Sequence, residues 1–159
     1  MGEYFSVLFN YGHRFSEDHE LIKDTIQELF ITIWEKRNNL SNDVNVKAYL
    51  LSSFRRALHR KIKPHIRMVS LKEQNLQSFD IRTCVEERFI KNESSVHLAK
   101  TISDLLNNLP DRQKEVIYLK YFLDLSRQEI SETLGIVPQT VSNIIQMALK
   151  NLKISWPAK

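Results

Sequence analysis

Between Leu21 and Trp34 the apolar residues recur every three or four positions, at Leu21, Ile22, Ile26, Leu29, Phe30, Ile33 and Trp34. This spacing predicts an α-helix with these residues along one buried face. Ser16, followed by two acidic residues, is expected to cap the start of this helix. A shorter apolar helix is predicted before it, over residues 3–15, with an interruption at Gly12.

The opposite face of the same predicted helix is acidic and includes one exposed isoleucine. Its residues are again spaced by three and four, at Asp24, Gln27, Glu28, Ile31 and Glu35. An isoleucine exposed among acidic and amide side chains indicates a surface that contacts another macromolecule.

A third helix is predicted over residues 46–63, ending before Pro64. Val46, Tyr49, Leu50, Ser53, Phe54, Ala57 and Leu58 would point inward, while Arg55, Arg56, Arg60 and Lys63 would lie on or beside one exposed edge. Residues 47–72 hold eight basic and no acidic groups, whereas residues 1–46 hold four basic and eight acidic groups. If residues 47–72 held half as many basic groups, a solvated helix face would be a sufficient explanation. Eight basic groups without an acidic one instead favour binding to a polyanionic partner.

Residues 65–93 show no helical or strand period and are interpreted as a linker. Helical spacing resumes at Val96 and continues, past Pro110, toward the C-terminus. The predicted fold is therefore all-α, with a three-helix domain over residues 1–66, a linker over 67–93 and a second helical domain over 94–159.

The second domain contains the pattern of a helix-turn-helix, LSRQEISETLGIVPQTVSNIIQMALKNLK, over residues 125–153. Ser126 and Glu129 form a capping box, Gly135 would end the first helix, and Pro138 would begin the second. The buried stripe of the second helix would be Val141, Ile144, Ile145, Ala148, Leu149 and Leu152. Its first turns would then present Gln139, Thr140, Ser142 and Asn143 to a DNA major groove, while Arg112, Lys114, Lys120 and Arg127 could contact phosphates. A small helical hairpin that touches no DNA would give a similar pattern.

Several classes of function are disfavoured by composition. The chain of 159 residues has three scattered glycines, one cysteine and five histidines, so it lacks phosphate-binding glycine loops, disulfides and zinc-ligand spacings. We therefore expect no metal, no cofactor and no enzymatic activity. No apolar run is long enough to cross a membrane and no signal segment opens the chain, which predicts a cytoplasmic protein without membrane insertion.

The order of these features, with the runs DTIQELFITIW (residues 24–34) and LSRQEISETLGIVPQTV (residues 125–141), resembles the extracytoplasmic-function (ECF) sigma factors of the sigma-70 family. The resemblance implies a sigma2-like domain and a helix-turn-helix sigma4-like domain. The implied partners are core RNA polymerase, promoter DNA and an anti-sigma factor. The segments YGHRF and WEKRNNL look most like members from Bacteroidetes.

The resemblance also implies roles for individual residues. Asp24, Gln27 and Glu28 match the polymerase-binding motif, and Tyr49 with Leu50 opens the helix that reads the promoter −10 element. Arg55 and Arg56 would face that element, with Arg56 where many members have Asn. The segment from Val137 to Asn143, which includes Pro138, matches the helix that reads the −35 element. Ser142 and Asn143 replace basic residues common there, which implies a weaker grip on the DNA backbone.

Two other functions fit parts of the pattern. A conventional transcription regulator would bind duplex DNA through the helix-turn-helix and use its N-terminal helices for dimerisation or ligand sensing. In such a protein the acidic face at Asp24, Gln27 and Glu28 would have no polymerase to bind. A hydrolytic enzyme is the third candidate, but Asp24 and Glu28 lack a third metal ligand at helical spacing.

Overall fold

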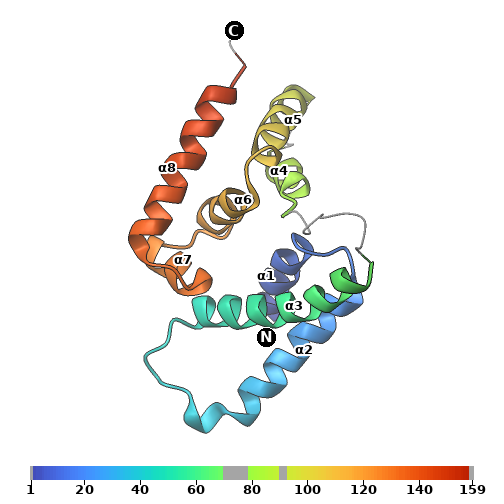
Figure 1. The fold of residues 1–159 in the computed structure, drawn as a ribbon, viewed down its shortest axis with the longest axis vertical. Coiled ribbons are helices and arrows are strands. Elements are labelled where there is room, and N and C mark those ends of the chain that lie inside the picture. Colours follow the sequence, from blue (N-terminus) through green and yellow to red (C-terminus); the bar gives the residue numbers. More distant parts are fainter. Residues whose placement is uncertain (1, 70–78, 90–92, 158–159) are drawn as a thin grey trace. The chain divides into compact units, whose positions relative to one another are not determined.

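The computed structural model describes residues 2–69, 79–89 and 93–157, and all regular secondary structure in these ranges is helical (Figure 1). The all-α prediction is therefore confirmed. The helices form two compact units. Glu132–Gly135 is grouped with the first unit, and the second unit comprises Phe79–Ser131 and the residues from Ile136 onward.

The N-terminal unit consists of α1 (Gly2–His13), α2 (His19–Glu35), the short 3₁₀ helix η1 (Arg37–Asn39) and α3 (Val46–Val69). Each of the three α-helices packs against the other two (Figure 1). Their apolar faces meet in a core whose fully buried side chains include Leu8, Tyr11, Ile22, Ile26, Leu51, Phe54 and Leu58. The predicted three-helix domain is therefore present, and its helices meet through their buried apolar residues.

The corner between α1 and α2 differs from the prediction in its cap and in the role of glycine. Asp18, not Ser16, caps α2, because its Oδ1 accepts a hydrogen bond from the Leu21 N–H at 3.0 Å. Gly12 lies within the last turn of α1 and is buried. A Cβ there would lie 2.8 Å from Phe54 Cζ and 2.9 Å from Ile22 Cγ2. Gly12 therefore allows the three helices to approach closely.

The predicted end of the third helix at Pro64 is wrong, because α3 continues through this residue to Val69. Proline lacks the N–H that would bond the carbonyl four residues earlier, and its ring crowds that carbonyl. However, its fixed φ angle is that of a helix. A helix can therefore continue beyond a proline, and the local rule placed the boundary too early.

The C-terminal unit contains α4 (Arg82–Phe89), α5 (Glu93–Asn107), α6 (Asp111–Ile117), the π-helical turn η2 (Tyr118–Phe122), the first part of α7 (Arg127–Leu134) and α8 (Pro138–Ser155). Helix α5 packs against α4 and α8, and α6 packs against α8. The buried core includes Ala99, Val116, Leu119, Leu125, Ile130, Val141 and Ala148.

The prediction of a linker over 67–93 is wrong for its described C-terminal part. Phe79, Ile81 and Val85 are at most 1% exposed, and α4 packs against α5. The Phe79 N–H donates to Asp111 Oδ1 at 3.2 Å, and Arg88 donates to the Tyr121 carbonyl at 2.6 Å. These contacts join the segment to the second unit. Residues 70–78 and 90–92 of the predicted linker lie outside the described residues.

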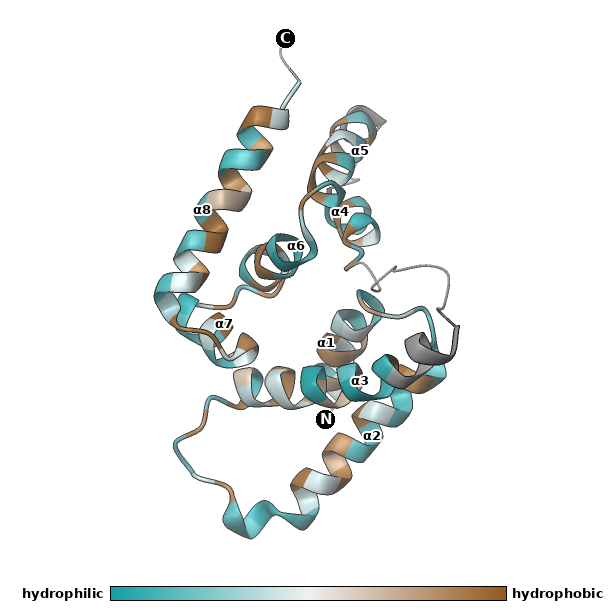
Figure 2. Ribbon diagram, in the orientation of Figure 1, coloured by the Kyte–Doolittle hydropathy of each residue, from teal (hydrophilic) through white to brown (hydrophobic). Residues whose placement is uncertain are grey.

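Three predicted apolar stripes, on α2, α3 and α8, are wider than the faces that are buried. Trp34 is 68% exposed at the end of α2, and Val46 is 54% exposed at the start of α3. On α8 only Val141 and Ala148 are buried, while Leu149 is 46% exposed. Figure 2 shows apolar and polar bands alternating along α8. Helix α8 has 18 residues and packs mainly against α5 and α6, so it buries a narrow stripe.

Candidate nucleic-acid interface

The outer face of α2 presents the predicted polymerase-binding residues together. Asp24, Gln27, Glu28, Ile31 and Glu35 are all exposed, and Ile31 is 58% exposed. Glu28 Oε2 forms an ion pair with Lys61 Nζ of α3 at 2.7 Å. The predicted exposure of this face is confirmed, and the ion pair links it to the basic helix.

An apolar hollow of about 490 Å³ adjoins this face between α1 and α2. Its lining residues are Gly2, Phe5, Ile26, Gln27, Phe30 and Ile31. The spacing of residues along one helix does not predict this hollow, because Phe5 belongs to α1 and comes beside α2 only in the folded unit. Gln27 and Ile31 thus belong to both the acidic face and the lining of the apolar hollow.

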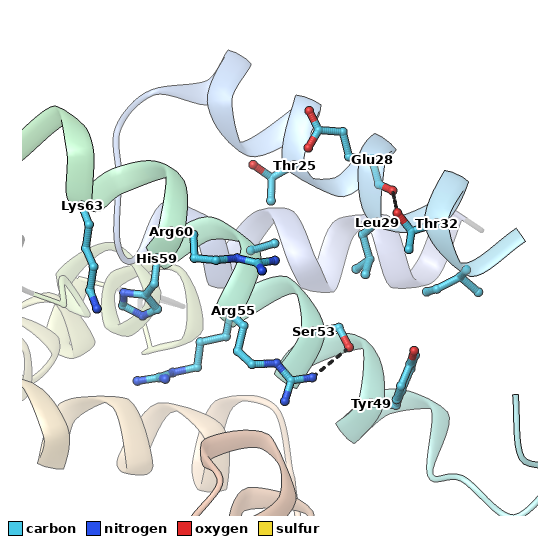
Figure 3. A pocket seen from close by; sticks show the side chains of 13 residues that line it. Thr25, Glu28, Leu29, Thr32, Tyr49, Ser53, Arg55, His59, Arg60 and Lys63 are labelled. Atoms are coloured by element: carbon cyan, nitrogen blue, oxygen red, sulfur yellow. Dashed lines mark hydrogen bonds between the residues drawn. The ribbon is translucent and has the colours of Figure 1, made fainter. Parts of the chain in front are cut away.

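A larger groove lies between α2 and α3 and has a volume of about 730 Å³ (Figure 3). We call it the α2–α3 groove. It brings together all five residues predicted to contact the −10 element, with side chains of α2 on the opposite wall. Its lining residues are Thr25, Glu28, Leu29, Thr32, Ile33, Tyr49, Ser53, Arg55, Arg56, Ala57, His59, Arg60 and Lys63.

The groove is strongly basic on its α3 side. Arg60 and Lys63 are exposed and form no ion pair with any carboxylate in the described part of the chain. Arg56 is also exposed, and its Nη2 lies 3.5 Å from Ser53 Oγ (Figure 3). The charge of Glu28 on the opposite wall is matched by Lys61. Several cations therefore face the same open space, as the binding of a phosphate backbone requires.

Aromatic and hydroxyl groups complete the groove. Tyr49 is half-buried on its wall, whereas Phe54 is fully buried in the core and is not available for stacking on a base. Thr25 and Thr32 were not predicted as lining residues, and their hydroxyls donate to the helix carbonyls of Leu21 and Glu28 at 2.7 and 2.8 Å. Ser53, which was predicted to point into the core, lines the groove instead.

The helix-turn-helix has the predicted local geometry. The Ser126 N–H donates to Glu129 Oε2 at 2.7 Å, and the Glu129 N–H donates to Ser126 Oγ at 3.1 Å, which is a capping box. Gly135 has a φ of +64°, a left-handed conformation that favours glycine. Pro138 is in the first turn of α8.

The first turns of α8 carry the residues predicted to read DNA. Gln139 and Asn143 are exposed, and Gln139 Nε2 donates to Asn143 Oδ1 at 3.1 Å. Arg127 Nη1 on α7 donates to Ser142 Oγ at 3.2 Å, which joins the two helices of the motif. Pro138 and Thr140 are half-buried.

The other predicted phosphate-binding residues differ in accessibility. Arg112 lies on α6, and its Nη1 is 3.9 Å from Glu115 Oε2. Lys114 is 4% exposed, and its Nζ contacts Asp111 Oδ1 and the Asn107 carbonyl. Lys114 is therefore a structural residue of the C-terminal unit, and a role in phosphate binding does not fit its burial.

The described residues contain no group of three or more His, Cys, Asp or Glu side chains that could hold a metal ion. No helix in the described ranges is both long enough and apolar enough to cross a membrane.

Comparisons with known proteins match both units. The family model for sigma-70 region 2 matches residues 2–67, and the model for sigma-70, region 4 matches residues 99–152. The RNA polymerase sigma-F factor of Bacillus subtilis is 32% identical over 53 residues, which cover 33% of this chain and 21% of that relative. The match thus spans about a fifth of the relative's length.

The fold is also similar to a solved structure. The sigma factor RpoE from Bartonella quintana, in a co-crystal structure with the anti-sigma factor NepR, matches with a TM-score of 0.62 and 18% identity. The match covers 95% of this chain and 90% of the other. The α2–α3 groove lies in the segment matched by region 2, and the helix-turn-helix lies in the segment matched by region 4. The chain therefore carries a sigma-70 region 2 domain and a sigma-70, region 4 domain.

Proposed function

We propose that this protein is a sigma factor that binds core RNA polymerase and directs transcription from specific promoters. The outer face of α2 contacts the polymerase, and the α2–α3 groove holds the −10 element. The first turns of α8 read the −35 element. The sigma-70 regions matched by both units support this division of roles.

The observation that carries the proposal is that one chain combines an open basic groove with a helix-turn-helix. The α2–α3 groove is an open basic channel with one aromatic wall residue, which suits a flexible single strand. The helix-turn-helix presents short amide and hydroxyl side chains, which suit the base edges of a duplex. Promoter opening requires both kinds of contact, whereas a regulator of duplex DNA requires only the second.

We further assign the chain to the ECF group, with an anti-sigma factor as its regulator and the cytoplasm as its site of action. The two-domain match to the Bartonella quintana sigma factor, solved with an anti-sigma factor, supports this assignment. The DNA chemistry is then performed by core polymerase, and the chain supplies binding and recognition.

The test is in vitro transcription with core RNA polymerase on a library of promoters with randomised −10 and −35 elements. We expect transcripts only when the chain is added, from templates that share two sequence elements. The Asp24→Lys variant should strongly reduce these transcripts and the co-elution of the chain with core polymerase. Transcription that does not depend on the chain, or wild-type activity of Asp24→Lys, would contradict the proposal.

A further inference from the structure

Gln139 and Asn143 lie one turn apart at the start of α8, and both side chains are exposed. The bond from Gln139 Nε2 to Asn143 Oδ1, at 3.1 Å, joins their amides. A free glutamine side chain on a helix surface samples many rotamers. The bond to Asn143 restricts the orientation of the Gln139 amide before any DNA is bound.

From this geometry we propose that Gln139 reads one adenine of the −35 element and that Asn143 is the positioning residue that holds the Gln139 amide for this contact. The inference rests on the proposed role of α8 in reading the −35 element. It separates the two residues, which the sequence pattern alone treats as equal readers of bases.

The donor and acceptor groups of Gln139 fit adenine. One Nε2 hydrogen is used by Asn143, so Gln139 keeps its Oε1 acceptor and its second Nε2 hydrogen. In the major groove adenine presents the N6 amino donor and the N7 acceptor, which pair with these two groups. Guanine presents two acceptors at N7 and O6, so Oε1 would face an acceptor. An amide held in this orientation therefore discriminates between the two purines.

Ser142, the polar residue beside Asn143, has a hydrogen-bond partner outside α8. Ser142 Oγ accepts from Arg127 of α7, so this hydroxyl is engaged within the motif. Thr140 is half-buried, and Val141 is fully buried in the core. Gln139 and Asn143 are thus the pair of exposed amides in the first turns of α8.

The test uses the full-length chain assembled with core RNA polymerase and a duplex selected from a library randomised over the −35 region. Each adenine of the selected duplex is replaced in turn by 7-deazaadenine, which lacks the N7 acceptor. We expect one position at which this replacement weakens binding of the wild-type protein by ~10-fold. In Gln139→Ala the same replacement should have no effect. In Asn143→Ala, where Gln139 is present but less well oriented, the sensitivity should be about twofold smaller than in the wild type. The double variant should lose no more selectivity than Gln139→Ala.

Two further variants distinguish positioning from direct reading. Asn143→Asp keeps an oxygen that accepts from Gln139 Nε2, so it should retain the ~10-fold sensitivity even though its negative charge weakens binding to every duplex. Gln146→Ala removes another exposed amide of α8 and should behave as the wild type.

The inference is overturned if Asn143→Ala affects a different base pair from Gln139→Ala, if the two effects add, or if Asn143→Asp loses the sensitivity. It is also overturned if no adenine in the selected duplex responds to the replacement. If the chain forms no complex with core polymerase, or selects no duplex, the proposed sigma-factor function fails as well. The two failures are therefore distinguishable.

Discussion

The close approach of helices at Gly12 gives the most quantitative prediction. In Gly12→Ala the new methyl carbon would lie 2.8 Å from Phe54 Cζ and 2.9 Å from Ile22 Cγ2. Carbon atoms that are not bonded normally lie ~3.5–4.0 Å apart. Phe54 and Ile22 are both 0% exposed, so neither side chain can move into solvent. The methyl group must therefore push α1 away from α2 and α3.

Two opposing effects set the magnitude. Adding a methylene to a tightly packed core costs roughly 1–3 kcal/mol. Replacing glycine by alanine within a helix returns about 0.8–1 kcal/mol, because glycine loses more backbone freedom on folding. We expect a net loss of ~1 kcal/mol in the free energy of unfolding of the N-terminal unit. In a unit of this size such a loss lowers the melting temperature by about 4–8 °C.

The measurement is urea and thermal unfolding of the full chain, followed by far-ultraviolet circular dichroism. Gly2→Ala is the matched control, because nothing lies within 4 Å of a Cβ at that position. Phe54→Leu removes the atom that clashes, so it should cost less stability in the Gly12→Ala background than in the wild type. A Gly12→Ala variant as stable as the wild type, or strict additivity with Phe54→Leu, would refute the steric argument.

Three further predictions concern the proposed interfaces and the helix-turn-helix. Asp24→Lys should weaken binding to core polymerase by about 10-fold or more, measured by co-elution, because it reverses a charge on the exposed face of α2. For binding to −10 single strands, the logarithm of the binding constant falls linearly with the logarithm of the salt concentration. Arg60→Ala should make this slope shallower by ~0.7, because one phosphate contact is lost. Ser126→Ala should destabilise the C-terminal unit by ~1 kcal/mol in urea unfolding, because it removes the capping bond to Glu129.

Each of these variants has a matched control. Glu86→Lys reverses an exposed acid on α4 and should leave polymerase binding intact, as Asp24→Lys should not. Lys150→Ala removes an exposed cation near the middle of α8, and the salt dependence of single-strand binding should be unchanged. Ser155→Ala removes a serine at the exposed end of α8 and should not alter stability. If a control variant changed the measured quantity as much as the variant it controls for, the contact assigned to that residue would be wrong.

The local signals in the helix-turn-helix predicted its geometry correctly, whereas the local signals at Ser16 and Pro64 did not. The capping box of Ser126 and Glu129, the left-handed Gly135 and the entry of Pro138 into α8 depend only on residues close in the chain, and all three are present. The exposure of the α2 outer face also followed from spacing alone. Such features depend on residues within one or two helical turns of each other, and the amino-acid sequence shows these neighbours directly.

The features that depend on distant residues could not be predicted in this way. Helix α4 has a weak amphipathic pattern, and its segment is held by contacts of Phe79 with Asp111 and of Arg88 with Tyr121, more than thirty positions along the chain. The α2–α3 groove needs Thr25 and Thr32 opposite the basic helix, and spacing on one helix does not reveal what faces it. Gly12 was interpreted as an interruption because its neighbours, Phe54 and Ile22, are remote in sequence.

Different residues of α8 are buried in the core and exposed to solvent, and this separation affects how promoter preference can evolve. Val141 and Ala148 anchor the helix in the core, whereas Gln139 and Asn143 project into solvent and support none of that packing. With α8 in its proposed role as the reader of the −35 element, substitutions at the two exposed positions should change the preferred promoter without loss of folding. Duplicated genes could then diverge in the promoters they use through very few mutations. For the same reason α8 is a suitable place to engineer a sigma factor that ignores the promoters of its host.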